Sequence, residues 1–229
     1  ALADLSAGMF AAMGILIALH EREQSGRGQW VQTSLLQAQI FMLDFQAARY
    51  LVAGDVAGQV GNNHPTGAPT GVFRTLDGYV NVAPTPVMWK RFCKAIERDD
   101  LVEHPHYATP KDRRKHRDEL NNLISEITKT MTTTAVVDRL NAAGIPCGPI
   151  YTIDETFADP QVRYLEISQS VQSSALGTIN LVGQPFTLSR TPSKLVSGAP
   201  EYGEHTDGIL AEMGYSANDI SKWRRSGTI

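Results

Sequence analysis

Cysteine is scarce in this chain. Cys93 and Cys147 are the only two among 229 residues, and neither has a second cysteine or a histidine nearby at ligand spacing. Structural zinc sites and disulfide frameworks need several such residues close together in sequence. The sequence therefore predicts neither, and it fits a reducing compartment, for which we expect the cytoplasm.

An excess of charge of one sign is also lacking. The chain has 21 lysine and arginine residues against 24 aspartate and glutamate residues, for a net charge of -3, and the two signs are mixed along its length. A nucleic-acid backbone is held by a sustained positive field. We therefore expect no nucleic-acid partner.

Long apolar runs are the third absence, because His20, Glu21 and Arg22 close the first run before it reaches the roughly 20 residues of a membrane helix. Asp4 and Ser6 stand where a secretory signal would be basic. We expect no membrane partner and no signal peptide. Since the chain starts without Met, almost directly in a helix, we also expect it to be part of a longer polypeptide.

What is present is a mixture of helix and strand patterns, without internal repeats. Apolar residues at three-to-four spacing predict a long, deeply packed helix over 5–23, stopped by Ser25–Gln29, whose Gly-x-Gly is a connecting turn rather than a dinucleotide fingerprint. A strand over 30–34 and a second helix over 35–52 follow. Further helices are expected over 88–96, from 117 through 127, over 135–143, in part over 155–162, from 206 through 213 and over 217–223. Strands are expected between 165 and 188, with a turn at Leu176-Gly177.

Two stretches mark the middle of the chain. Residues 53–69 are rich in Gly, Asn and Pro and read as a loop and domain boundary, although consecutive Gly and Asn amides can also cradle an anion. Asp77-Gly78 between two alternating apolar runs predicts a hairpin that opens a second, smaller unit. In the helix after it, Trp89, Phe92 and Cys93 face inward, so Cys93 is predicted to be a core thiol and not a nucleophile.

Two sets of polar residues invite a functional interpretation. His104, His106 and His116 are close in sequence, but prolines break any single face and no carboxylate stands at a metal-like offset, so no metal site is expected. Asp4, at the start of the first helix, is either a helix cap or a placed carboxylate. Taken alone, the cap is the simpler interpretation.

Several stretches then occur in one familiar order, and together the chain resembles the back part of a class III CoA-transferase. That family includes formyl-CoA:oxalate and carnitine CoA-transferases and the alpha-methylacyl-CoA racemases. The stretches that carry the resemblance are Ala3–Gly8, Ser25–Gln29 with Ser34, Gly61–Pro65, Pro69–Phe73, Asp77–Val80, Gly144–Pro149 and Gly203–Thr206.

The resemblance implies an α/β fold, mixed α+β in this portion, with part of a large Rossmann-like domain and a small α+β domain. Two such chains would interlock as a homodimer. The implied division is 1–52 for a large-domain segment, 53–69 for a linker and active-site loop, 70–145 for the small domain, 146–164 for a second linker and 165–229 for the return to the large domain. The Rossmann-like front half, with most of the CoA-contacting residues, would lie outside this chain.

The resemblance also implies a chemistry. Asp4 matches the family's catalytic aspartate, which attacks an acyl-CoA thioester and forms first a mixed anhydride and then an aspartyl-CoA thioester. The substrates would be an acyl-CoA and a small carboxylic acid, with no cofactor and no metal. Gly61, Asn62, Asn63 and His64 match a glycine-rich loop that covers the active site, and His64 is a candidate to bind the acceptor carboxylate.

Two alternatives remain open. A racemase would use Asp4 for proton transfer, with a glutamate shortly after the strand at Tyr79–Val82, where this chain has Thr85-Pro86-Val87-Met88 and no carboxylate. A non-catalytic binding fragment would have Asp4 only as a cap.

Overall fold

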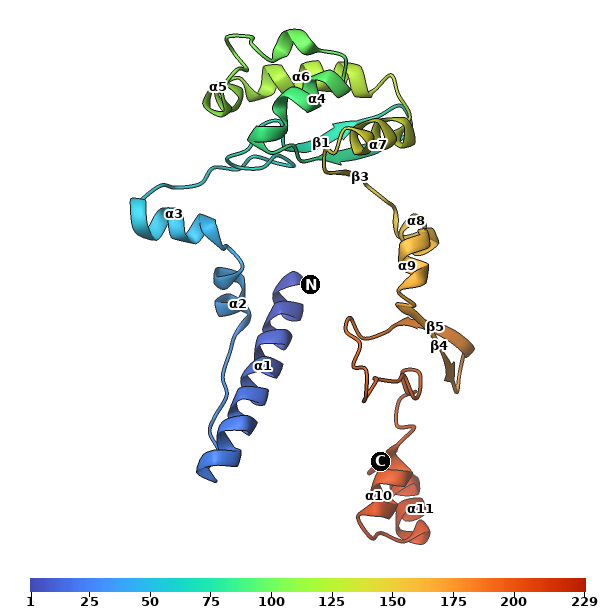
Figure 1. The fold of residues 1–229 in the computed structure, drawn as a ribbon. Coiled ribbons are helices and arrows are strands. Elements are labelled where there is room, and N and C mark those ends of the chain that lie inside the picture. Colours follow the sequence, from blue (N-terminus) through green and yellow to red (C-terminus); the bar gives the residue numbers. More distant parts are fainter. The chain divides into compact units, whose positions relative to one another are not determined.

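A computed structural model describes all residues from 1 to 229. The chain divides into two compact units, Ala1–Ile150 and Tyr151–Ile229, each with its own internal contacts (Figure 1).

The first unit opens with the long helix α1, Leu2–Ser25, which ends at Gly26 in the left-handed conformation (φ 73°). A glycine adopts this conformation without the steric cost of a side chain. The prediction that the helix ends within Ser25–Gln29 is therefore confirmed. The expectation of a deeply packed helix was wrong, because Leu5, Met9 and Leu16 are all more than half exposed and only Ser6 and Ala7 are buried.

The length and composition of α1 also correct the expectation about apolar runs. Its mean hydropathy over 18 residues reaches 1.9, with 11% of that window buried, so this one helix is long and apolar enough to cross a membrane. A helix that packs inside a soluble protein passes the same test, and so does an N-terminal signal. Helix α1 is therefore an apolar helix, and most of its large apolar side chains are exposed.

The second predicted helix is two helices, α2 (Leu35–Phe41) and α3 (Phe45–Ala53), separated at Met42–Asp44. Ser34 caps α2 by accepting a hydrogen bond from the Gln37 amide at 3.2 Å. The expected strand over 30–34 is extended chain without a strand partner. Helix α2 packs along α1, where the rings of Phe10 and Phe41 meet edge to face at 5.0 Å.

A three-stranded antiparallel sheet follows, in the order β1-β2-β3. The predicted hairpin is confirmed as β1 (Gly71–Arg74) and β2 (Tyr79–Val82), with Phe73 opposite Val80. The third strand, β3 (Cys147–Pro149), pairs with the other side of β2 and was not predicted. Phe73, Val80 and Val82 are buried whereas Tyr79 and Asn81 are exposed, so one face of the sheet is covered.

Helices cover that buried face (Figure 1). Helix α6 packs on β1 and α7 packs on β2 and β3. Trp89, Phe92 and Cys93 of α4 are buried, as predicted. The bounds of the elements between β2 and β3 are η1 Pro86–Met88, α4 Trp89–Ala95, η2 Asp99–Leu101, α5 Pro110–Lys115, α6 Arg117–Thr128 and α7 Thr133–Ala142. We call residues 71–149 the sheet segment; its side chains form the main hydrophobic core.

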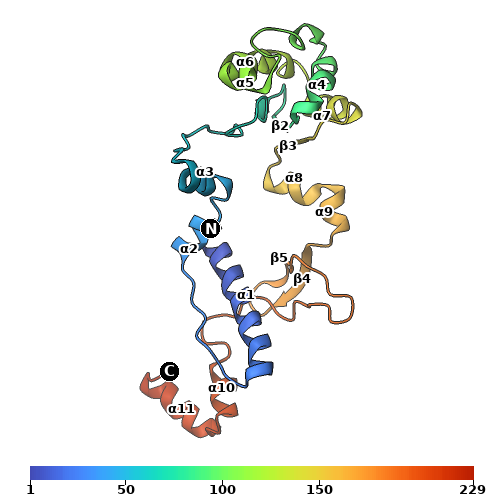
Figure 2. The same cartoon turned by 60° about the vertical axis from the view of Figure 1, so that its left-hand side comes forward.

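The second unit begins with helices α8 (Ile153–Ala158) and α9 (Pro160–Tyr164). A two-stranded hairpin, β4 (Ser168–Ser173) and β5 (Gly177–Val182), confirms the strands and the turn predicted there. The short helices α10 (Thr206–Glu212) and α11 (Ala217–Ser226) end the chain (Figure 2). Val171 and Ile220 are its only buried hydrophobic residues, so this unit has almost no core of its own.

The mixed α/β class is thus confirmed. Both sheets are antiparallel, so these residues contain no parallel Rossmann-like sheet. The Rossmann-like half, the interlocked dimer and the five-part domain division stay predictions.

Candidate functional site

Asp4 lies inside the first turn of α1, and it is exposed. The helix is capped by Ala1 without a side-chain hydrogen bond, so the interpretation of Asp4 as an N-cap was wrong. The Asp4 carboxylate takes part in no hydrogen bond or ion pair, whereas the neighbouring Ser6 hydroxyl donates to the Leu2 carbonyl at 2.7 Å. A carboxylate in a first turn is favoured by the helix dipole, and here it is exposed without a hydrogen-bond partner.

The loop with the predicted substrate-binding residues is internally ordered by His64. Its Nδ1 accepts hydrogen bonds from the amides of Gly67 at 2.9 Å and Thr66 at 3.2 Å. An accepting Nδ1 places the proton of a neutral imidazole on Nε2, so the free nitrogen of this exposed ring is a donor. The ring also stacks on Phe45, with centroids 5.9 Å apart.

Two side chains of helix α6 hold this loop by hydrogen bonds. Arg117 donates from Nη1 to the His64 carbonyl at 2.6 Å and from Nη2 to the Pro65 carbonyl at 3.2 Å. Asn121 donates from its amide to the Asn63 side-chain oxygen at 2.8 Å. Arg117 and Asn121 lie four residues apart on one helix face, so the sheet segment fixes the loop by two successive turns of α6. Sequence reasoning missed both residues.

A third anchor, Arg113, is buried at 2% exposure. Its Nη1 donates to the Tyr107 carbonyl at 2.7 Å and its Nε donates to the Ala68 carbonyl at 3.2 Å. The guanidinium also lies 4.5 Å from the centre of the Trp89 ring. Burial lowers the pKa of Arg113 from its usual range, but the carbonyl partners and the ring compensate the buried charge.

Only part of the loop can offer amides to an anion. The amides of Asn63 and His64 donate to Val60 and Thr70 carbonyls. Those of Gly61 and Asn62 have no partner within the chain, and both residues are exposed. Of the four predicted substrate-binding residues, Gly61 and Asn62 therefore offer backbone donors, His64 offers a ring N–H, and the Asn63 side chain is occupied by structural contacts. No hydrogen bond joins this loop to Asp4.

The cysteines offer no nucleophile. Burial raises the pKa of Cys93 to about 12 and also raises the pKa of Cys147, so both thiols stay protonated at neutral pH. The prediction that Cys93 is a core thiol is confirmed by its complete burial.

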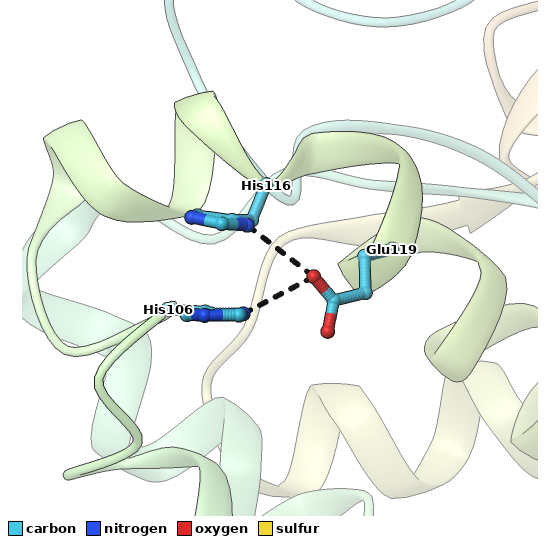
Figure 3. Close-up of side chains that lie close together, drawn as sticks. All are labelled: His106, His116 and Glu119. Atoms are coloured by element: carbon cyan, nitrogen blue, oxygen red, sulfur yellow. Dashed lines mark hydrogen bonds and ion pairs between the residues drawn. The ribbon is translucent and has the colours of Figure 1, made fainter.

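The histidine cluster contradicts one expectation. Glu119 lies between His106 and His116, so a carboxylate does stand beside the histidines (Figure 3). The signal was present in the sequence, because His116 and Glu119 are three residues apart at the start of a helix and so share one face.

Comparison with known proteins gives these features a family. The profile of CoA-transferase family III matches residues 1–206. An acyl-CoA transferase of Fusarium pseudograminearum is 32% identical over 231 residues, covering all of this chain and 51% of that protein. A succinyl-CoA–D-citramalate CoA-transferase of Chloroflexus aurantiacus is 29% identical, over 95% of this chain and 55% of that protein.

Solved structures agree. A CAIB/BAIF family protein from Brucella suis superposes with a TM-score of 0.78 at 29% identity, covering 92% of this chain and 55% of that one. The chain thus spans about half the length of the relatives it matches. By the extent of the profile match, with these relatives in support, the chain belongs to CoA-transferase family III.

Proposed function

We propose that the protein containing this chain moves CoA from an acyl-CoA to a carboxylic acid, with Asp4 as the nucleophile. The observation that carries the proposal is the exposed Asp4 carboxylate, free of hydrogen bonds and ion pairs in the first turn of α1. A carboxylate used as a cap or a salt-bridge partner would have to give up that partner before it attacked a thioester. Asp4 has no such partner to lose.

The reaction balances without an added base or oxidant. An Asp4 oxygen attacks the thioester carbonyl, the C–S bond breaks, and CoA leaves as a thiolate, which leaves a mixed anhydride on Asp4. The thiolate then attacks the aspartyl carbonyl and releases the donor acid. The acceptor carboxylate attacks the resulting aspartyl-CoA thioester, the C–S bond breaks, and CoA again leaves as a thiolate, which leaves a second mixed anhydride between Asp4 and the acceptor. This thiolate attacks the acceptor's carbonyl and frees the new acyl-CoA and the Asp4 carboxylate.

The loop over 61–64 is proposed to cover these intermediates. The free amides of Gly61 and Asn62 and the His64 Nε2–H are donors suited to an oxyanion or an acceptor carboxylate. Because Arg117 and Asn121 hold the loop on α6, these donors would be placed before substrate arrives. The part of the loop around Gly61 would then be the part that closes over the site. Gly61 has a φ of 58° and makes no hydrogen bond to α6.

The exposed apolar side chains of α1 support a longer protein. They include Leu5, Met9, Met13 and Leu16, each more than half exposed. We propose that the remaining half of the polypeptide, and a second copy of the protein, cover them and complete the CoA site.

The test uses the full-length protein with an acyl-CoA and hydroxylamine, followed by mass spectrometry of the peptides. An acyl-enzyme or thioester intermediate gives a hydroxamate on Asp4. Asp4→Ala should lose both the adduct and transfer, whereas Glu21→Ala, at the other end of the same helix, should keep both. Full turnover by Asp4→Ala would overturn the proposal.

The racemase alternative makes a separate prediction. Residues after β2 form the short helix η1, Pro86–Met88, and contain no carboxylate to act as a second base. Exchange of the substrate alpha-proton in deuterated water, without an acceptor acid, would nevertheless establish it. A non-catalytic fragment predicts neither exchange nor transfer.

A further inference from the structure

His106, His116 and Glu119 meet at the surface of the sheet segment, on the side where α5 passes into α6 (Figure 3). His106 comes from the turn before α5, His116 is the junction residue between α5 and α6, and Glu119 lies in the first turn of α6. One ligand atom from each lies within 4.8 Å of the others. Three chain positions thus converge on one small volume.

The distances match a set of metal ligands. Glu119 Oε2 lies 3.2 Å from His106 Nδ1 and 3.3 Å from His116 Nδ1. Ligand atoms of a tetrahedral Zn²⁺ site, with bonds of about 2.0–2.1 Å, lie about 3.3–3.4 Å from one another. The nitrogen–oxygen edges of such a site are therefore already formed, and little backbone movement is needed to place an ion inside them.

The two rings must turn before both nitrogens can face one ion. They stack with centroids 3.8 Å apart and planes 10° from parallel, so their Nδ1 lone pairs run side by side instead of converging. The His106 side chain is 47% exposed and on a turn, which leaves it free to tilt. The His116 side chain, 25% exposed, is the fixed member of the pair.

A buried tyrosine lies next to His106 in the same turn. Tyr107 is 2% exposed, and its ring stacks on that of His104 with centroids 4.6 Å apart. Its carbonyl accepts a hydrogen bond from Arg113 at 2.7 Å. The backbone of the turn that carries His106 is therefore held in place beside the other two side chains.

We propose that His106, His116 and Glu119 bind one divalent transition-metal ion of the Zn²⁺ type, with water completing the coordination. Two imidazoles and a carboxylate suit zinc and its neighbours better than calcium or magnesium, which prefer oxygen ligands alone. The bound ion links the turn before α5 to the first turn of α6. Arg117, the residue after His116, holds the active-site loop through His64 and Pro65, so the ion stiffens the support of that loop.

The experiment is calorimetric titration of the untagged chain with ZnCl₂ in a buffer that does not bind metals. We expect one site per chain. His106→Ala and Glu119→Gln should each weaken binding by about tenfold or more, since each removes one of three ligands. His205→Ala and Cys147→Ser, which alter possible ligands elsewhere, should leave the affinity unchanged.

Cobalt gives a second readout that does not depend on affinity. Co²⁺ in the same site should give the intense visible absorption of tetrahedral coordination, and the double variant His106→Ala/Glu119→Gln should lose it while keeping its far-ultraviolet circular dichroism. No one-to-one binding of Zn²⁺, or equal binding by the folded double variant, would overturn the proposal.

Discussion

The sheet segment and α1 both carry many apolar side chains, but the sheet segment buries them and α1 leaves most of them exposed. In the sheet segment Phe92, Leu120 and Ile124 are completely buried, and helices enclose one face of the sheet. Along α1, Leu16 and Ile17 are more than 60% exposed. The difference shows that residues 71–149 complete their own core, whereas α1 presents an apolar surface that the rest of the first unit leaves uncovered.

The largest expected effect separates the two regions physically. The excised segment 60–150 should unfold cooperatively in urea, because it carries nearly the whole buried core. The excised segment 1–58 should show no cooperative transition, since α1 to α3 bury only a few small residues. Circular dichroism against urea measures both. A cooperative transition in the second segment alone would reverse the comparison.

Replacing single leucines by alanine should show the same contrast between the two regions, with a smaller change in stability. Leu120→Ala removes a fully buried side chain from α6 and should cost about 2–5 kcal/mol of unfolding free energy. Leu16→Ala removes a side chain that is 66% exposed and should change stability by less than about 0.5 kcal/mol in this chain. If a longer protein covers α1, as we propose, the cost of Leu16→Ala should be larger in that protein, which thermal unfolding of both forms would reveal.

The anchor of the loop offers a third test. Arg117→Ala removes hydrogen bonds from a charged group to the carbonyls of His64 and Pro65, worth on the order of 1–2 kcal/mol. Amides in the peptide 58–70 should then exchange with deuterium about tenfold faster. Arg114→Ala, on the exposed side of α5 and without hydrogen bonds, is the matched control and should not alter the exchange rate.

The smallest effect concerns pH. Hydrogen bonds from the Thr133 amide and hydroxyl lower the pKa of Asp77 from its usual range. Its ionised form is thus favoured in the folded state, so its contribution to stability is present above the unfolded pKa of about 3.9 and is lost as the pH falls through the lower folded pKa.

Asp77→Asn should therefore reduce stability at pH 7 and make it less sensitive to acid. Urea midpoints at pH 7 and pH 3 measure the difference, and we expect the gap between them to be narrower in the variant. Asp118→Asn, at an exposed position without such bonds, should preserve the gap of the parent chain. An unchanged gap in Asp77→Asn would mean that the contacts with Thr133 do not favour ionised Asp77.

Local chemistry explains which parts were predictable. The hairpin at Asp77-Gly78 and the end of α1 at Gly26 depend on residues adjacent in sequence, and both were predicted correctly. Strand β3 was missed because Pro146 and Pro149 argue against a strand, and only its pairing with β2, more than 60 residues away, forms it. The predicted strand over 30–34 does not form for the converse reason, since its residues favour a strand but have no partner strand to pair with.

The residues of the candidate site also differ in how far the sequence predicts them. Asp4 and the loop residues came from a resemblance of ordered motifs, which locates residues but does not describe their surroundings. The helix partners Arg117 and Asn121 lie more than 50 residues from the loop they hold, so no local pattern indicates them. Glu119 was not predicted as a neighbour of the histidines, although its spacing of three residues from His116 places both on one face of a helix.

The register of the sheet has a consequence for how the protein can be rebuilt. Gly71 pairs with Val82 on one side of β2 and Pro149 pairs with Val80 on the other, so the chain enters and leaves the sheet segment on two strands that run in the same direction, with the exit two residues farther along. Two strand spacings and a rise of two residues place these points about 12 Å apart. A module whose ends lie this close can be cut out, transplanted or closed by a linker of a few residues, and its sequence can be restarted at an exposed turn.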